Sequence, residues 1–249
     1  MSPPSNAPLP HDQTQRVYGF WNERAQEFGS DQRATLAETY LRDIEIRAML
    51  AHLHRLNPRN VLDVGCGNGY STKIYARALP GTQFVGVDFS EGMLSYAEVD
   101  RPPNCNFALG DLTDPATLPT ATFDVVYTQR CIQNLPDYET QCAAIQDLLS
   151  RRTPGGTLIL NECSRSGVEQ LNRWRRHLGR KPIENIEPWH NCFLIDAKLR
   201  DDFHAEIECI SSTYMFLAKV IHPRLSRLAA QYLPAVGQFG YDRFYVIRN

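Results

Sequence analysis

The stretch VLDVGCGNGYSTKIYARALPGTQFVGVDFS, residues 61–90, contains the pattern from which the fold class follows. It begins as an apolar strand, passes through glycines at positions 65, 67 and 69, and continues as a helical run that Pro80-Gly81 ends. A second apolar strand then leads to Asp88. Short apolar strands that alternate with helices are typical of a parallel sheet covered on both faces. The stretch therefore predicts an α/β protein, and glycines directly after a strand indicate a place for a nucleotide.

The alternation of strand and helix continues as far as residue 161. We expect strands at 60–64, 83–87, 105–108, 123–128 and 157–161, and helices at 70–79, 92–99 and 138–150. Residues 164–204 interrupt this rhythm with a basic helical stretch at 170–178, and strand patterns resume at 207–211 and 241–247. Before the first strand, apolar residues recur at three- and four-residue spacing up to residue 56, which indicates helix. These patterns predict an α/β fold with an insertion before its last strands.

The same patterns predict how the chain is organised. Residues 1–13 are polar and proline-rich and lack the features of a signal peptide, so we expect a disordered tail there. Residues 14–249 are expected to form a single domain. Its predicted parts are an N-terminal helical cap, a ligand-binding core, an insertion that acts as lid or substrate site, and the final strands, at residues 14–57, 58–163, 164–204 and 205–249.

The composition argues against several classes of protein. Lys and Arg number 26 against 28 Asp and Glu, and the net charge of −2 does not favour nucleic acid as a partner. The 7 cysteines are scattered and form no CxxC pair, which argues against a disulfide framework and against a zinc site. No apolar run reaches the length of a membrane span. We expect a cytoplasmic protein without a metal, and either a monomer or a homodimer.

The three glycines differ in spacing from the two best-known phosphate-binding loops. A dinucleotide fingerprint GxGxxG would place its last glycine at position 70, where this chain has Tyr70. A phosphate-binding loop would continue as Gly-Lys-Ser/Thr, and Lys73 is out of place for that. A turn this tight needs residues that tolerate positive φ, and a ligand lying on the backbone leaves no room for a Cβ. Taken alone, the loop could equally be a structural turn.

Two acidic residues sharpen the interpretation of the glycine loop. Asp88 ends the second strand and can accept hydrogen bonds from both hydroxyls of a ribose, although it could instead be a helix cap or turn aspartate. Asp111, in Gly110-Asp111-Leu112 after the third strand, can accept a hydrogen bond from an exocyclic amino group such as that of adenine. By itself that tripeptide is only a turn. Together the loop and both acids lie at the carboxyl edge of one parallel sheet, where ligands bind in open sheets.

With these motifs the chain resembles the class I S-adenosylmethionine-dependent methyltransferases. The resemblance covers roughly residues 58–162, and it is carried by VLDVGCGNGYST, FVGVDFSEGML, ALGDLTD, FDVVYTQRCIQNLPD and RTPGGTLILNE. It implies a Rossmann-like, seven-stranded and mostly parallel sheet with helices on both faces and an antiparallel last strand. It also implies S-adenosyl-L-methionine as cofactor, S-adenosyl-L-homocysteine as product, and no metal.

The resemblance also implies which residues contact the cofactor. The glycine loop would lie beneath the methionine part, Asp88 would hold the ribose, and Met93 would pack on the adenine. Gln129 and Arg130 would come near the transferred methyl group. The full set of expected cofactor contacts is Asp63, Gly65, Cys66, Gly67, Asn68, Gly69, Asp88, Phe89, Met93, Gly110, Asp111, Leu112, Gln129 and Arg130.

Residues outside the core motifs are candidates for the acceptor site. VYGFWNERAQEFG, residues 17–29, resembles a helix that closes over the cofactor in some small-molecule methyltransferases. In the insertion, His190 is the candidate catalytic base or orienting group, although it could equally be a loop histidine bonded to backbone. The arginines near Trp174 could bind an acidic substrate or form a solvated helix face. The expected substrate contacts are Tyr18, Trp21, Gln133, Trp189, Asn191 and Tyr214, of which Tyr214 could instead be core.

The sequence therefore predicts a methyltransferase that acts on an oxygen or nitrogen of a small-molecule acceptor, a metabolite or natural product. Methyl transfer chiefly requires that the acceptor be held in line with the breaking C–S bond while water is excluded. The alternatives are an RNA or protein methyltransferase, a nicotinamide-dependent oxidoreductase, and a non-catalytic member of the family. Tyr70 and the Asp111 motif argue against the oxidoreductase, and the net charge argues against RNA.

Overall fold

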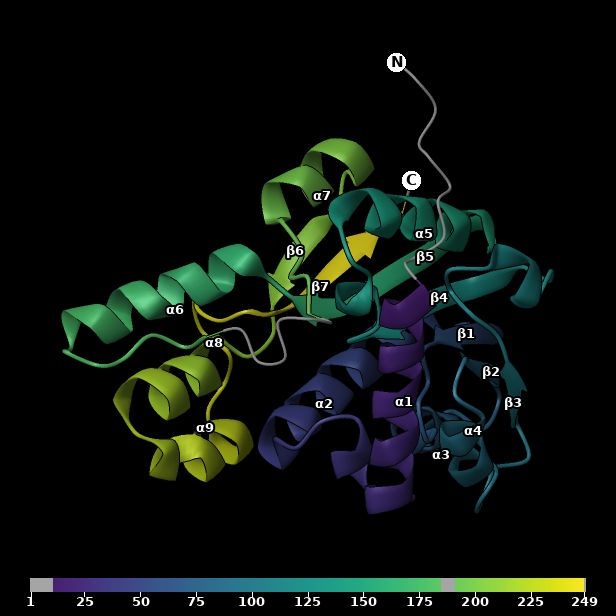
Figure 1. Ribbon diagram of the computed structural model, residues 1–249, viewed down its shortest axis with the longest axis horizontal. Helices are drawn as coiled ribbons and strands as arrows, with labels where there is room; N and C mark the ends of the chain where they lie inside the picture. The colour runs from purple at the N-terminus through teal and green to yellow at the C-terminus, as the bar shows by residue number, and fades with distance from the viewer. Residues whose placement is uncertain (1–10, 185–190, 249) are drawn as a thin grey trace.

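The computed structural model describes residues 11–184 and 191–248, and a seven-stranded sheet lies at the centre of this part (Figure 1). The strand order is β3-β2-β1-β4-β5-β7-β6. Neighbours from β3 to β5 pair in parallel, whereas β7 is antiparallel to both β5 and β6. The strands are β1 (Asn60–Val64), β2 (Gln83–Asp88), β3 (Cys105–Leu109), β4 (Phe123–Gln129), β5 (Arg152–Cys163), β6 (Glu206–Cys209) and β7 (Asp242–Ile247). The predicted α/β fold with an antiparallel last strand is confirmed.

Helices flank the sheet and form most of the N-terminal and C-terminal segments. They are α1 (His11–Phe28), η1 (Gln32–Ala34), α2 (Thr39–Leu56), α3 (Tyr70–Ala78), α4 (Glu91–Ala97), η2 (Pro115–Thr117), η3 (Ile132–Asn134), α5 (Tyr138–Ser150), α6 (Arg165–His177), α7 (Asp196–Phe203), α8 (Ser212–Tyr214), the π-helical η4 (Met215–Ile221), η5 (Pro223–Leu225) and α9 (Ser226–Tyr232). The helix α1 begins inside residues 1–13, which the sequence analysis assigned to a disordered tail. The expected helical run up to residue 56 is divided, because Gly29 turns with φ +54° and Asp31 caps η1.

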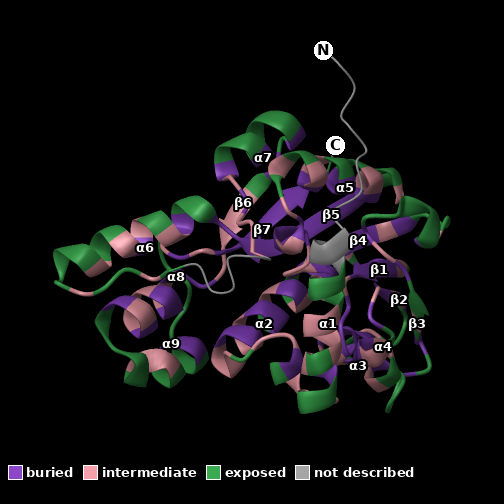
Figure 2. Ribbon diagram, in the orientation of Figure 1, coloured by how far each residue is buried: buried purple, intermediate pink, exposed green. Residues whose placement is uncertain are grey.

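The central strands are buried on both faces, as Figure 2 shows. Leu62 and Val64 of β1 point into one apolar core, together with α5 and α7, and Val61 points into the other, together with α2 and α3. Burial on both sides explains why these strands appear as continuous apolar runs rather than as alternating patterns. The sheet is therefore held rigidly, and its carboxyl edge presents the loops that follow β1, β2, β3 and β4.

A C-terminal lobe, formed by α6, α8, η4, η5 and α9, packs beside the sheet (Figure 1). Its apolar core includes Leu171 of α6, Tyr214 and Met215, and it also contacts Leu41 of α2. The sequence analysis expected residues 205–249 to supply only the final strands, but the segment between β6 and β7 is largely helical. These helices were not predicted because their apolar residues, which are buried against α2 and α6, form no regular pattern in the sequence.

Candidate functional site

The loop between β1 and α3 brings its backbone against neighbouring elements. Gly65 and Gly67 both have left-handed φ values, +79° and +56°. A Cβ atom at Gly65 would lie 2.5 Å from Cys131 Sγ, and one at Gly67 would lie 2.6 Å from Thr35 Cγ2. Any other residue at either position would be strained and would also displace a neighbour. The bare backbone of this loop therefore forms one wall of a cleft.

Gly69 serves packing rather than the cleft. Its φ is +68°, and a Cβ atom there would lie 2.6 Å from Phe107 Cζ and 3.1 Å from Ala97 Cβ. The third glycine thus lets the start of α3 lie close to β3 and α4. Gly69 does not line the cleft, unlike the first two glycines.

Asp88 lies at the end of β2, and its buried carboxylate is bonded to the glycine loop. Its Oδ2 accepts a hydrogen bond of 2.7 Å from the N–H of Gly67, and its Oδ1 accepts one of 2.9 Å from the N–H of Ser90. Burial raises the pKa of Asp88 to about 6, and these N–H donors oppose the rise. Each carboxylate oxygen keeps a further lone pair that can accept a hydrogen bond from a ligand.

The glycine loop and Asp88 line a cleft along the carboxyl edge of the sheet, which we call the rim cleft. One end lies at Arg42 and Ser71, and the other end lies at Asp111 and Leu112 after β3. The structure brings together here every expected cofactor contact except Gly69, namely Asp63, Gly65, Cys66, Gly67, Asn68, Asp88, Phe89, Met93, Gly110, Asp111, Leu112, Gln129 and Arg130. What these residues do toward a cofactor stays a prediction.

The polar groups of the rim cleft suit S-adenosylmethionine. Three buried atoms that line it have no hydrogen-bond partner within the described part of the chain, namely Asp63 Oδ1, Gln129 Nε2 and Arg42 Nε. The amide and the guanidinium are donors that match a carboxylate, and the Asp63 oxygen is an acceptor that matches an ammonium group. Asp111 offers a further acceptor at the opposite end. A nucleoside with an amino-acid tail therefore fits the donors and acceptors that the chain presents.

A second cavity of about 330 Å³, which we call the side cavity, adjoins the rim cleft. Trp21, Thr35, Arg130 and Asn134 line both spaces. The remaining walls include aromatic, aliphatic and amide side chains, among them Phe20, Leu36, Gln133, Val168, Asn191, Phe193 and Tyr241. A molecule in the side cavity would therefore lie next to a molecule in the rim cleft, at the wall that the two spaces share.

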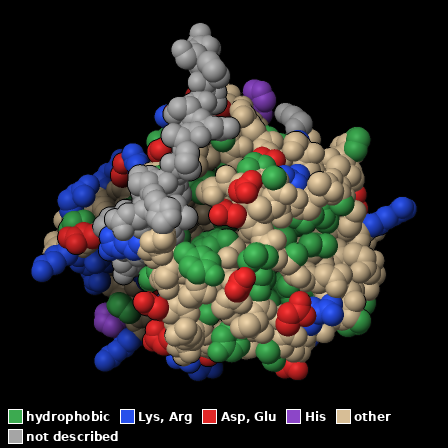
Figure 3. All heavy atoms as spheres, turned by 45° about the vertical axis from the view of Figure 1, so that its right-hand side comes forward, with side chains coloured by type: hydrophobic (Ala, Val, Ile, Leu, Met, Phe, Trp, Pro, Cys, Tyr) green, Lys and Arg blue, Asp and Glu red, His purple; other side chains and the backbone are tan. Residues whose placement is uncertain are grey.

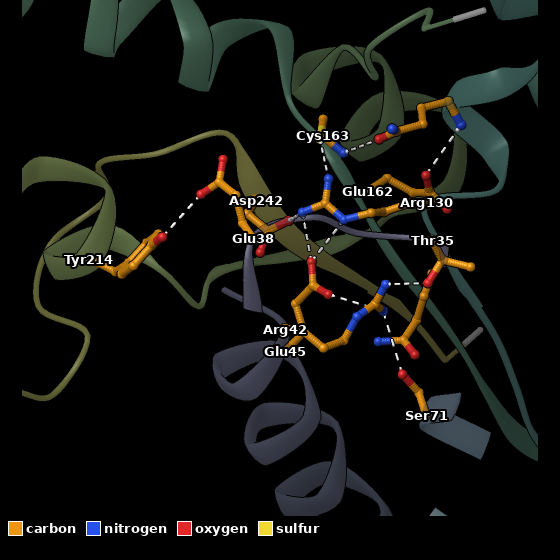
Figure 4. A network of polar contacts seen from close by, with 12 residues as sticks. Thr35, Glu38, Arg42, Glu45, Ser71, Arg130, Glu162, Cys163, Tyr214 and Asp242 are labelled. Atoms are coloured by element: carbon orange, nitrogen blue, oxygen red, sulfur yellow. Dashed lines mark hydrogen bonds and ion pairs between the residues drawn. The ribbon is translucent and has the colours of Figure 1, made fainter. Parts of the chain in front are cut away.

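A buried network of charged side chains lies at the junction of the two spaces (Figure 4). The Arg130 guanidinium donates to Glu45 Oε1 at 2.7 and 3.0 Å and to Asp242 Oδ1 at 2.8 Å. Arg42 is paired with the other oxygen of Glu45 at 3.3 Å and donates to Thr35 Oγ1 at 2.7 Å. The network joins α2 and β7 to the end of β4, and only Arg42 and Arg130 of its charged members line a cavity.

Glu162, near the end of β5, holds the loop that follows β4. Its Oε1 accepts hydrogen bonds from Thr128 Oγ1 at 2.8 Å and from the N–H groups of Cys131 and Ile132 at 3.0 and 3.1 Å. Its Oε2 accepts from the N–H of Gln133 at 3.2 Å. Burial raises the pKa of Glu162 to about 7, and these donors oppose the rise. The carboxylate thereby fixes the turn that carries Gln133 into the side cavity.

Three of the expected substrate contacts, Trp21, Gln133 and Asn191, line the side cavity. The amide of Gln133 donates to Asn191 Oδ1 at 3.0 Å, which links η3 to the segment before α7. Tyr18 lies elsewhere, at the outer end of the rim cleft beside Asp111, with its ring 5.8 Å from the ring of Phe89.

Tyr214 is separated from the side cavity by Glu38. Its hydroxyl donates to the Glu38 carboxylate at 3.0 Å, and its ring is buried in the C-terminal lobe. Of the two interpretations offered by the sequence, the structure therefore places Tyr214 in a core. Trp189 and His190 lie outside the described residues, so the predicted catalytic role of His190 stays a prediction.

Arg42 and Glu45 of α2 and Asp242 of β7 were not predicted from the sequence as site residues. A signal for the first two was present, because they recur at three- and four-residue spacing with Leu41, Ile46 and Met49 in the buried stripe of α2. Charged residues inside an apolar stripe must be paired or face a cavity. No comparable signal marks Asp242, whose partners lie on α2 and at the end of β4, far away in the sequence.

Several structural facts limit the chemistry of the described residues. Within 11–184 and 191–248, no three His, Cys, Asp or Glu side chains gather where they could hold a metal ion. The cysteines are all free thiols. Among the helices of the same ranges, none combines the length and the apolar character needed to cross a membrane.

Comparison with known proteins places this architecture among methyltransferases. Residues 61–156 match the family model described as a methyltransferase domain. The trans-aconitate 2-methyltransferase of Rhodopseudomonas palustris (strain BisB18) is 31% identical over 171 residues, which span 67% of this chain and 62% of that protein. The trans-aconitate 2-methyltransferase of Acidovorax sp. (strain JS42) is 26% identical over 214 residues, which span 80% of this chain and 81% of that protein. The chain thus spans less than two thirds of the first of these relatives.

Solved structures with the same fold cover nearly the whole chain. The magnesium protoporphyrin IX methyltransferase of Synechocystis PCC 6803 with bound S-adenosylhomocysteine has a TM-score of 0.62 at 19% identity, over 95% of this chain and all of that one. The DhpI complex with S-adenosylhomocysteine has a TM-score of 0.60 at 16% identity, over 96% of this chain and 98% of that one. At this identity the likeness establishes the fold.

Proposed function

We propose that this chain is a class I S-adenosylmethionine-dependent methyltransferase and that it transfers a methyl group from S-adenosylmethionine to an oxygen or nitrogen of a small-molecule acceptor. One observation carries the proposal. The rim cleft and the side cavity share a wall at Trp21, Thr35, Arg130 and Asn134, so a cofactor and an acceptor held in them would be adjacent.

In this proposal the rim cleft holds the cofactor through donors and acceptors at both ends. Asp88 accepts the ribose hydroxyls, and Asp111 accepts the amino group of the adenine. Arg42 and the bare backbone of the glycine loop hold the carboxylate of the amino-acid tail. Arg42 and Asp63 support this placement, because both residues line the cleft and each has a buried polar atom, Nε and Oδ1, without a hydrogen-bond partner within the described residues.

The cofactor, when bound, supplies a methyl group on a sulfonium, and its C–S bond breaks with the electron pair left on sulfur as the acceptor bonds the methyl carbon. The chain's own contribution is then positioning and exclusion of water. Trp21 from α1 and Thr35 after η1 line the junction of the two spaces. Asn68 holds the segment between α1 and η1 in place, because its amide donates to the carbonyls of Gly29 and Asp31 at 2.8 and 2.9 Å.

A small molecule is the favoured acceptor class. The relatives at 26–31% identity are named for a small acid, trans-aconitate. On the face shown in Figure 3, acidic, basic and apolar side chains are interspersed, with Lys and Arg gathered toward the left edge. The net charge of −2 argues against RNA as substrate. Free cysteines support a reducing location such as the cytoplasm.

Calorimetry with S-adenosylhomocysteine tests the proposal on the whole chain, with NADH as the matched control. We expect binding of S-adenosylhomocysteine and none of NADH. Methyl incorporation from labelled cofactor would then be compared among a small-molecule extract, total RNA and total protein. Absence of S-adenosylhomocysteine binding to the folded protein would overturn the proposal, and preferential labelling of RNA or protein would overturn its acceptor class.

A further inference from the structure

Arg130 is held in an unusual backbone conformation. Its φ is +58°, which is left-handed and unfavourable for a residue with a Cβ. The surroundings enforce this conformation, since its N–H donates to the Asn161 carbonyl at 2.8 Å and its own carbonyl accepts from Asn134 Nδ2 at 2.8 Å. Strain that several contacts maintain is characteristic of functional sites. The conformation directs the Arg130 side chain to the wall between the rim cleft and the side cavity.

The guanidinium of Arg130 is fixed by acids from two distant elements, as Figure 4 shows. Glu45 on α2 and Asp242 on β7 both accept from Nη2, and Glu45 also accepts from Nε. Both acids are fully buried. Nη1 has only a weak contact of 3.3 Å with Cys163 Sγ among the described residues, which leaves donor capacity toward the cavity.

The two acids of the cluster have pKa values shifted in opposite directions. Burial and the adjacent Glu45 raise the pKa of Asp242 well above its usual range. Burial also favours the neutral form of Glu45, but the guanidiniums of Arg130 and Arg42 prevail and hold its pKa below the usual range. Arg42 and Arg130 share Glu45, and both line a cavity, where a guanidinium can bind an anion.

Among the described residues that line the side cavity, no carboxylate or thiol is a suitable base, and the predicted base His190 lies outside the described residues. Its two carboxylates are Glu38 and Glu184, and Glu38 is already bonded to Lys219 Nζ and to the Tyr214 hydroxyl. Glu184 is exposed to solvent. The Cys163 thiol is buried, which raises its pKa to about 12 and keeps it protonated. An acceptor that must lose a proton before attack would need a positioned base.

We propose that the acceptor is a small carboxylic acid, bound as its anion by Arg130, and that Glu45 and Asp242 are positioning residues that hold Arg130 at the junction of the two cavities. This inference rests on the proposed function and narrows its acceptor class. A carboxylate is ionised at neutral pH, so its methylation needs no base and releases no proton. The guanidinium of Arg130 at the junction, its strained backbone and the amides of the side cavity all suit such a ligand.

The first experiment titrates acceptors into the protein loaded with S-adenosylhomocysteine. The probes are trans-aconitate, citrate and benzoate, with the neutral trimethyl ester of trans-aconitate, a neutral phenol and a primary amine as comparisons. We expect at least one carboxylate to bind, and the neutral ester to bind at least about tenfold more weakly. Arg130→Met should weaken carboxylate binding at least about tenfold, and by a larger factor than it weakens S-adenosylhomocysteine binding, because Arg130 lines both spaces.

A phenol or an amine that binds better than every carboxylate would overturn the inference and leave the proposed function standing. Failure of every probe to bind the loaded protein would also count against the inference, since it predicts an anion site. Loss of S-adenosylhomocysteine binding by the unaltered protein, by contrast, would remove the proposed function itself. The two failures are therefore distinguishable.

The second experiment separates positioning from mere stability through two changes at one residue. Asp242→Asn keeps an oxygen that can accept the hydrogen bond from Arg130 Nη2, so KM for the carboxylate that binds should stay within about threefold. Asp242→Ala removes the contact with Arg130 and should raise that KM at least about tenfold at nearly constant kcat. Glu45→Gln should likewise raise that KM at least about tenfold at nearly constant kcat. An unchanged KM in Asp242→Ala would overturn the positioning role.

Asp196→Asn is the matched control for the second experiment. Asp196 is paired with Arg243 in a buried contact next to Asp242 on β7, but neither residue lines the rim cleft or the side cavity. We expect this variant to lower stability without changing KM for the carboxylate. A KM increase equal to that of Asp242→Ala would show that any damage near β7 has the effect, and would overturn the positioning role as well.

Discussion

The rim cleft and the side cavity are built in different ways. The rim cleft is lined largely by residues at or just after the ends of consecutive parallel strands, from the loops that follow β1, β2, β3 and β4. The side cavity is lined by α1, the segment before α2, α6, the segment before α7 and the approach to β7, together with the loop after β4. The match to the methyltransferase domain covers residues 61–156, and of the side-cavity lining it includes only Arg130, Gln133 and Asn134. The rim cleft is thus a property of the sheet, whereas the side cavity depends on how helices pack around it.

The two spaces also differ in charge. Buried acids dominate the rim cleft, where burial raises the pKa of Asp63 to about 7 and that of Asp88 to about 6. Arg130 lies in the wall that both spaces share, and the side cavity is further lined by Arg24, Glu38 and Glu184. A cofactor that offers hydroxyl and ammonium donors suits the acids of the rim cleft, and the proposed anionic acceptor would contact the shared arginine. The variants below test whether the two spaces are as separable as this difference indicates.

The largest effect is expected at the glycine loop. Gly65→Ala should lower the free energy of unfolding by about 3 kcal/mol, because left-handed strain adds to the clash with Cys131, and should weaken S-adenosylhomocysteine binding about 100-fold. Gly155→Ala is the control, since its φ of +81° is also left-handed but no atom lies within 4 Å of the added Cβ. Urea unfolding and calorimetry measure both. Equal losses in the two variants would show that the loop has no special fit.

A smaller effect, confined to the rim cleft, is expected at Asp88. Asp88→Asn should weaken S-adenosylhomocysteine binding by about 2 kcal/mol, or about 30-fold, at pH 8. The unaltered protein should lose affinity as the pH falls below about 6, because the protonated acid accepts hydrogen bonds less well, and the variant should lack that slope. Calorimetry from pH 5 to pH 8 measures this, with the exposed Asp114→Asn as control. A flat profile in the unaltered protein would contradict the assignment.

Glu162 holds the loop after β4, which lines both the rim cleft and the side cavity, so its replacement should lower the stability of the fold. Glu162→Gln leaves one of the N–H donors around the carboxylate facing an amide NH₂, and the free energy of unfolding should fall by about 2 kcal/mol at pH 8. Urea unfolding measures the change. The control is Glu206→Gln, at an exposed pair with Arg248, where we expect a change within about 0.5 kcal/mol. If both variants matched the unaltered protein, the loop after β4 would be held by something else.

The smallest effect is expected where the C-terminal lobe meets α2. Lys219 of η4 is paired with Glu38 at 2.5 Å, and both side chains are 28% exposed. Lys219→Met should therefore cost only about 0.5 kcal/mol in unfolding free energy. The same change should leave the Kd for S-adenosylhomocysteine unchanged. Arg248→Met, at a more exposed pair, serves as control, and a loss above about 2 kcal/mol in Lys219→Met would mean that the lobe depends on this pair.

Much of the rim cleft was predictable from the sequence. The bounds of β1 and α5 were predicted to the residue, and the expected cofactor contacts apart from Gly69 were brought into one cleft. The reason is local. Apolar runs fix the strands, the strands end together at one edge of a parallel sheet, and the residues after those ends therefore meet.

The side cavity and its surroundings were predicted less well, and particular residues show why. Tyr214 was expected to contact substrate but is turned toward Glu38, and Arg42, Glu45 and Asp242 were not anticipated. Asp242 meets Arg130 across 112 positions in the sequence. Contacts of that kind arise only when separate elements pack together, and no local pattern encodes them.

The sequence by itself therefore determined the α/β sheet, the glycine loop and the acids that follow β2 and β3, because strand periodicity and strand ends are local properties. Only the tertiary structure decided that the segment between β6 and β7 is helical, that the side cavity opens onto the rim cleft, and that one carboxylate of α2 is shared by two arginines. These features depend on which surfaces meet in three dimensions, and on the cost of burying charge, which only a partner from elsewhere in the chain can offset.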